Sequence, residues 1–208
     1  PFAMVASALR HAMGIRGAEP LDLRRRKLLD RVSKRVPTTE QRRVVEFLGE
    51  LLATPFEDAS SVQLRAARQD PMLMGDQMRR AFEDFVAAEC RHRPVLVILE
   101  DLHWGDMPSI SFFDHALRNL GEMPLMVLAF ARPEVHDLFP GLWSERDLQE
   151  VRLSRLTRKA SAKLVHQVLG DDASETLVLR LVERAEGNAF YLEELIRAVA
   201  EGRGDKLP

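Results

Sequence analysis

The 208-residue sequence contains little cysteine and no long apolar run. Cys90 is its single cysteine, so no disulfide can form within the chain, and a reducing, cytoplasmic setting is expected. The longest apolar run, Val95 to Leu99, is much shorter than the roughly 20 residues of a membrane span. The sequence has no charged start followed by an apolar stretch, so no signal peptide is indicated. The sequence therefore predicts no membrane partner.

Neither sign of charge is in large excess, since 30 Lys and Arg residues stand against 32 Asp and Glu residues, for a formal net charge of -2. This balanced charge does not indicate nucleic acid as a partner. The most basic stretch, Arg24 to Lys27, has no interleaved aromatic residues and is typical of a solvated helix face. The histidines around Cys90 lack the spacing of zinc ligands. We therefore expect neither a nucleic-acid surface nor a structural zinc site.

Apolar residues at helical spacing extend from the start of the chain to Arg91 and resume at Thr157. Thr38 or Thr39 is expected to cap one of the early helices, and Thr157 the first of the late ones. A loop with a short helical turn is expected over residues 56–71. The predicted helices cover residues 2–13, 21–36, 39–55, 71–91, 157–169, 174–185 and 190–200.

Two short apolar runs between these helical regions predict β-strands. Val95 to Leu99 and Leu125 to Phe130 are unbroken by polar residues, which is typical of parallel strands covered on both faces. The intervening helix, residues 106–120, has Pro108 in its first turn and completes a βαβ unit. The sequence thus predicts an α/β fold with a parallel sheet flanked by helices. Leu148 to Leu153 is a candidate third, shorter strand.

Two adjacent acids, Glu100 and Asp101, follow the first predicted strand. Ligands of open α/β sheets bind at the carboxyl ends of the strands, and successive side chains there point to opposite sides. One acid can therefore serve a magnesium ion while the other orients a water molecule for attack on a phosphate. A solvated strand end is the alternative interpretation. Asp106, a few residues further on, is expected to cap the helix through Pro108.

Three sequence signatures follow one another along the chain. They are Val95-Leu-Val-Ile-Leu-Glu-Asp-Leu-His-Trp-Gly-Asp106, then Ala131-Arg-Pro-Glu134, then Gly187-Asn-Ala-Phe-Tyr-Leu-Glu-Glu-Leu195. Together they resemble the Walker B strand, the end of the next strand and the lid of AAA-like, STAND-class P-loop ATPase modules in bacterial signalling proteins. The resemblance covers about Pro71 to Gly202.

This resemblance implies a partial P-loop ATPase core over residues 1–150 and a helical lid subdomain over residues 151–208. Within the core, the Walker B strand would be residues 95–101, and residues 125–132 would form the strand that ends at the terminal phosphate of ATP. Glu100 stands where the family places its magnesium-associated acid, and Asp101 where it places the water-orienting acid. The resemblance thus makes both residues catalytic and metal-associated, and contact with Mg²⁺ through a water molecule remains open.

The other family positions concern the nucleotide itself. Arg132 matches the arginine that contacts the terminal phosphate, and the alternative is a surface arginine held by Glu134. Gly187 and Asn188 match the lid element near the base and sugar, although Ala189 replaces the family's proline; the alternative is an ordinary helix cap. His103 and Trp104 belong to the family's signature, and Trp104 is expected to be a packing residue.

The motif Gly-x-x-x-x-Gly-Lys-Ser/Thr, which cradles phosphates in this family, does not occur in the sequence. Both ends of the chain look like cuts in a longer polypeptide, so the core is expected to be N-terminally incomplete. The parent is expected to bind ATP and Mg²⁺ as a regulatory switch, and this chain alone to be inactive. The implied partners are the nucleotide and a kinase or transcriptional output domain of the same polypeptide, and self-association remains open. The alternative function is a non-catalytic interaction module that binds no nucleotide.

Overall fold

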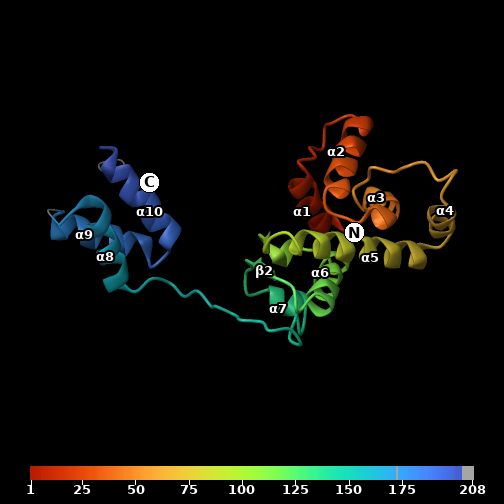
Figure 1. Ribbon diagram of the computed structural model, residues 1–208. Coiled ribbons are helices and arrows are strands. Elements are labelled where there is room, and N and C mark those ends of the chain that lie inside the picture. Colours follow the sequence, from red (N-terminus) through yellow and green to blue (C-terminus); the bar gives the residue numbers. More distant parts are fainter. Residues whose placement is uncertain (172, 203–208) are drawn as a thin grey trace. The chain divides into compact units, whose positions relative to one another are not determined.

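The computed structural model describes residues 1–171 and 173–202, and the chain divides into two compact units (Figure 1). The first unit is Pro1–Leu148 and the second is Gln149–Pro208. The sequence placed this boundary between residues 150 and 151. Each unit has a hydrophobic cluster of its own.

Helices make up most of the first unit, and α5 is the longest of them, with 20 residues. This helix contacts α3, α4, α6 and the first strand, so it forms the centre of the unit. Asp70 caps it by accepting hydrogen bonds from the backbone N–H groups of Met72 and Leu73. The helices are α1 (Ala3–Met13), α2 (Leu21–Ser33), α3 (Thr38–Leu51), α4 (Val62–Gln69), α5 (Pro71–Cys90), α6 (Met107–Asn119) and α7 (Val135–Leu138).

Two strands form a parallel pair, with α6 as the crossover between them. Strand β1 (Val95–Leu99) pairs with β2 (Leu125–Ala129) in a register that places Leu99 opposite Ala129. This confirms the predicted parallel pair around a helix, and the fold is α/β with a strong helical majority. A short 3₁₀ turn, η1 (Leu102–Trp104), follows β1.

The prediction that both sheet faces are buried is wrong. One face packs against helices α5 and α6, with Val95, Val97 and Val127 half-buried against the core. The other face is largely open over the described residues, where the sheet has only two strands. Four of its apolar side chains are more than half exposed, whereas Leu128 is less exposed. The four are Leu96, Ile98, Met126 and Phe130.

Three further predictions differ from the structure. Residues 148–153 form no strand and pair with no described strand. The expected short turn within residues 56–71 is the two-turn helix α4, capped by Ser61. Neither Thr38 nor Thr39 caps α3, because the helix already begins at Thr38 and the carbonyl of Pro37 accepts from Gln41.

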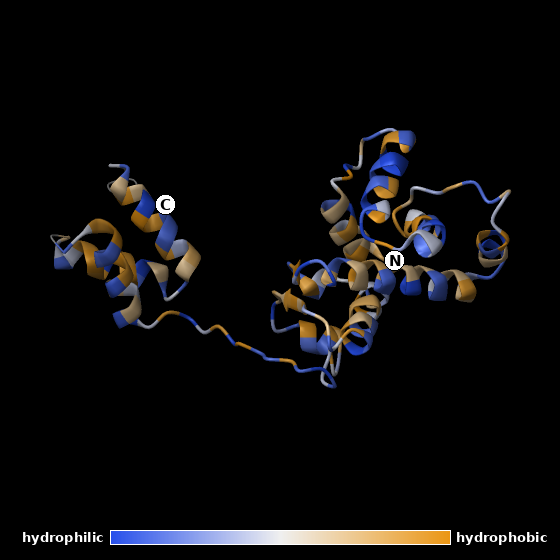
Figure 2. Cartoon of the chain, in the orientation of Figure 1, coloured by the Kyte–Doolittle hydropathy of each residue, from blue (hydrophilic) through white to orange (hydrophobic). Residues whose placement is uncertain are grey.

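The second unit is a bundle of three helices, α8 (Arg158–Leu169), α9 (Glu175–Ala185) and α10 (Ala189–Ala200). Each has a side-chain cap at its start, provided by Thr157, Ser174 and Asn188. Apolar residues gather on one side of these helices, as the hydropathy colouring in Figure 2 shows. Across the described residues, no helix combines the length and apolar character that crossing a membrane requires.

Candidate functional site

The backbones of the two strands stay paired beyond the sheet itself. Phe130 donates its N–H to the carbonyl of Leu99 at 2.8 Å, and Leu102 donates to the carbonyl of Phe130 at 2.9 Å. The residues that follow β1 and β2 are therefore held at the same edge of the sheet. The structure brings Glu100 and Asp101 to the edge from which Arg132 also extends.

The two acids of this edge are accessible to a ligand. Glu100 is exposed, and the side chain of Asp101 is 59% exposed. Asp101 also has a left-handed backbone, with φ of 52°, where the chain turns from β1 into η1. Within residues 1–171 and 173–202, no group of three or more His, Cys, Asp or Glu side chains could hold a metal ion. Two carboxylates nevertheless fit Mg²⁺, which takes one or two carboxylates together with substrate phosphates and water.

Arg132 lies in the exposed stretch that follows β2. Its guanidinium makes no ion pair with any residue in the described part of the chain, so the expected alternative of an arginine held by Glu134 is not observed. The positive charge of Arg132 is thus available to an anion at the sheet edge. The backbone N–H of Arg132 is held, because it donates to Nδ1 of His103 at 3.3 Å.

His103 and Trp104 lie beside each other in η1 but differ sharply in burial. His103 is 8% exposed, whereas Trp104 is 74% exposed, so the expected packing role of Trp104 is not seen within the first unit. Their ring centroids are 5.0 Å apart. Nε2 of His103 lies 3.9 Å from a carboxylate oxygen of Asp101. The sequence marked this pair only through the family signature.

Asp106 caps α6, as predicted, and also holds the start of α1. Its carboxylate accepts hydrogen bonds from the backbone N–H groups of Ser109 at 3.0 Å, Phe2 at 2.7 Å and Ala3 at 3.0 Å. Burial pushes the pKa of Asp106 upward, but the hydrogen bonds from Ser109, Phe2 and Met4 outweigh it and leave the pKa below its usual value. Asp106 is thus a structural residue beside the acid pair.

Gly187 and Asn188 belong to the second unit and have clear structural tasks there. Gly187 has φ of +77°, and a Cβ at this position would lie 2.6 Å from the carbonyl oxygen of Leu156. Its own carbonyl accepts from the N–H of Leu156 at 2.8 Å. Asn188 caps α10 by accepting from the N–H of Tyr191 at 3.1 Å. The helix-cap interpretation therefore accounts for these two residues without a nucleotide.

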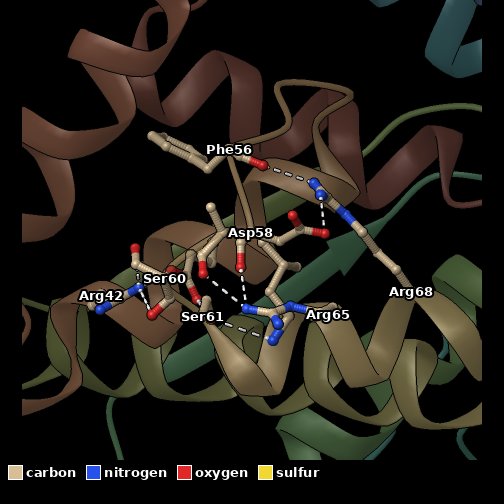
Figure 3. Close-up of polar contacts among 10 residues, drawn as sticks. Arg42, Phe56, Asp58, Ser60, Ser61, Arg65 and Arg68 are labelled. Atoms are coloured by element: carbon tan, nitrogen blue, oxygen red, sulfur yellow. Dashed lines mark hydrogen bonds and ion pairs between the residues drawn. The ribbon is translucent and has the colours of Figure 1, made fainter.

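A second polar cluster, which the sequence did not indicate, holds the loop between α3 and α4 (Figure 3). Arginine side chains donate to successive backbone carbonyls of this loop. Arg68 donates to Phe56 at 2.7 Å, and Arg65 donates to Ala59 at 2.8 Å. The other pairs are Arg24 with Ala53, Arg25 with Pro55, and Arg42 with Ser60.

This loop borders a pocket of about 580 Å³ between α2 and α3. Arg25 and Arg42 line it, but both already bind carbonyls of the loop, and the acids Glu46 and Glu57 balance their charge. The pocket contains none of the predicted site residues. We therefore attribute the arginine cluster to loop structure.

Comparison with known proteins gives little further guidance. No family model matches the chain, and no solved structure matches it. A stretch of 67 residues, 32% of this chain, is 30% identical to a Rhizobium meliloti (strain 1021) protein named Uncharacterized protein R02095. The stretch spans 6% of the length of that protein. The chain is thus similar to a small part of a much longer polypeptide.

Proposed function

We propose that this chain is part of an ATP-dependent regulatory switch, with its nucleotide phosphates at the carboxyl edge of the β1–β2 sheet. One observation carries the proposal. Two exposed acids and an arginine without an ion-pair partner in the described chain converge on one edge of a parallel sheet. Such edges are where ligands bind in open α/β folds, and the sequence signatures resemble those of P-loop ATPase modules.

The three side chains have different roles, which follow from their charges. Glu100 and Asp101 hold Mg²⁺, and Asp101 also accepts a hydrogen bond from the attacking water and so orients it. The ion neutralises phosphate charge when it is bound. Arg132 pairs with the terminal phosphate, where negative charge is concentrated. Asp106 takes no part, because its oxygens are occupied by backbone and hydroxyl donors.

The proposal requires a phosphate-binding loop that this sequence does not contain. That loop normally supplies oriented backbone amides and a lysine, each charge-assisted bond contributing roughly 1.5–3 kcal/mol. We expect the 208-residue chain alone to bind Mg-ATP weakly or not at all. A natural polypeptide that contains this chain together with such a loop is expected to bind it several orders of magnitude more tightly.

Calorimetric titration of Mg-ATP into that longer polypeptide tests the proposed site. Arg132→Ala should weaken binding by about 10–100-fold, because one charge-assisted bond to phosphate is lost. Glu100→Gln should weaken the dependence of binding on Mg²⁺. Arg118→Ala and Glu122→Gln are matched controls, since both residues are exposed and lie near the start of β2, at the opposite edge. Equal effects at both edges, or none at either, would contradict the site.

A non-catalytic interaction module is the second candidate, and the open apolar face of the sheet favours it. Such a module would use the surface around Ile98 and Met126, and not the acids, to bind another protein. Tight Mg-ATP binding that is lost in Arg132→Ala argues against this candidate. Full retention of signalling output in a Glu100→Gln, Arg132→Ala double variant argues for it.

A further inference from the structure

His103 is buried beside an exposed acid and an exposed tryptophan. His103 is 8% exposed, and its side chain lies between the turn after β1 and the stretch after β2. Burial of an imidazole without hydrogen bonds is costly, so the partners of its two ring nitrogens matter.

The ring of His103 continues the hydrogen-bond ladder of the sheet. The first two bonds beyond the strands are made by backbone groups, Phe130 to Leu99 and Leu102 to Phe130. The backbone cannot make the next bond, because the chain leaves the strand direction at Asp101 with φ of 52°. Nδ1 of His103 takes the place of the missing carbonyl and accepts the N–H of Arg132 at 3.3 Å.

This bond fixes which nitrogen carries the hydrogen in the neutral ring. A nitrogen that accepts a hydrogen bond has no hydrogen of its own, so the hydrogen is on Nε2. Within the described part of the chain, Nε2 has no hydrogen-bond partner. A carboxylate oxygen of Asp101 lies 3.9 Å from Nε2, and the Asp101 side chain is 59% exposed.

We propose that His103 is the positioning residue of the site: Nδ1 of its ring holds the backbone of Arg132, and Nε2–H is presented to the carboxylate of Asp101. The ring fixes the point from which the Arg132 side chain starts and offers an N–H that orients Asp101. Its importance for nucleotide chemistry rests on the proposed function. The alternative is that the ring serves only as a packing surface under Trp104.

The link itself can be measured in the full chain without nucleotide. Ring ¹⁵N spectra of the neutral imidazole should show hydrogen on Nε2 and none on Nδ1. The amide of Arg132 should be protected from hydrogen exchange. His103→Phe keeps a ring but removes the acceptor, so this protection should be lost. His103→Asn offers an oxygen near the position of Nδ1 and should restore it.

The coupling to Asp101 is measured with Mn²⁺ alone as the probe of the acid pair. His103→Phe and His103→Asn both lack the Nε2 donor, so each should bind Mn²⁺ about tenfold more weakly than the wild type, the lower range for loss of a residue that orients a ligand. Arg118→Ala should bind it unchanged.

Several results would overturn the proposal. These are hydrogen on Nδ1, unchanged protection of Arg132 in His103→Phe, failed rescue by His103→Asn, or unchanged Mn²⁺ affinity in both variants. The ring spectrum of the wild type remains decisive if His103→Phe does not fold. If the wild type binds no Mn²⁺ but shows the expected ring spectrum and Arg132 protection, the proposed metal site fails while the link from His103 to Arg132 stands.

Discussion

A single carboxylate, that of Asp106, joins the starts of α1 and α6. It accepts bonds from both helices, and four donor groups of Phe2, Ala3 and Ser109 converge on it. Unpaired N–H groups at a helix start are a favourable environment for negative charge. The residue therefore stabilises the fold beside the site that we propose.

Replacing Asp106 with alanine should destabilise the first unit by about 2–3 kcal/mol, from a lost cap and lost charged hydrogen bonds. Asp106→Asn should cost less, because asparagine also caps helices. The lowered pKa gives the stabilisation a pH dependence. It is fully present above about pH 4, the range of an unfolded aspartate, and is lost as pH falls through the lower folded pKa. Urea unfolding of the wild type and both variants at several pH values measures this, and equal acid sensitivity in all three would contradict it.

Gly187 is a second residue on which local structure depends. Gly187→Ala combines a left-handed backbone with a clash against Leu156, so we expect a loss of about 2–4 kcal/mol in the second unit. Gly202→Ala is the matched control, because Gly202 has a φ of +75° but meets no atom within 4 Å. It should cost about 1 kcal/mol. Helical circular dichroism during thermal unfolding compares them, and equal losses would show that the contact with Leu156 is unimportant.

At the scale of elements, the loop between α3 and α4 depends on side chains from three helices. Its carbonyl groups have no strand or helix partners, and the arginines of α2, α3 and α4 satisfy them instead. Arg68 contributes several of these contacts, because it also forms ion pairs with Glu50 at 2.6 Å and with Asp58 at 2.9 Å. Partly exposed guanidiniums of this kind stabilise modestly but order the backbone locally.

Arg68→Ala should therefore loosen the loop more than it lowers global stability. We expect chymotrypsin to cleave after Phe56 about tenfold faster. The reason is that the free energy of local opening falls by the contribution of one to two hydrogen bonds. Arg26→Ala, on the exposed side of α2, is the control and should leave cleavage unchanged. An unchanged cleavage rate in Arg68→Ala would mean that the remaining arginines hold the loop without it.

The elements themselves were largely predictable from apolar spacing. Both strands, the α6 crossover and the caps Asp106 and Thr157 follow from local patterns that the structure contains. The open face of the sheet was not predictable, because an unbroken apolar run gives the same pattern whether or not a partner covers it. The arginine contacts could not be predicted either, since they join residues that are distant in sequence. The role that we propose for His103 depends on a side-chain bond between the segments that follow the two strands, which no local spacing encodes.

At the scale of the whole molecule, the described part of the chain contains two hydrophobic clusters that share no residue. One cluster lies within residues 2–143 and contains Trp143, and the other lies within residues 156–199 and contains Leu181. Each cluster is formed within one unit, so each unit has its own source of stability.

This separation predicts selective effects of core variants. Leu181→Ala should destabilise the second unit by about 2–5 kcal/mol. Trp104 and Trp143 both belong to the first unit, so tryptophan fluorescence reports that unit alone, whereas far-ultraviolet circular dichroism reports both. Leu181→Ala should shift part of the dichroism transition and leave the fluorescence transition in place. Phe113→Ala should shift the fluorescence transition together with the part of the dichroism transition that comes from the first unit. A shift of the fluorescence transition in Leu181→Ala would show that the units unfold together.

The open sheet has a consequence for the handling of this protein. Strand β1 is an uncharged apolar segment of high β-propensity, and in the described chain it has one unpaired edge. Such segments seed aggregation, and proteins commonly flank them with charged residues or proline. Here the flanks are Arg93 and Pro94 on one side and Glu100 and Asp101 on the other. We therefore expect neutralisation of the acid pair to promote aggregation, so such a variant must be checked by light scattering before a loss of activity is assigned to chemistry.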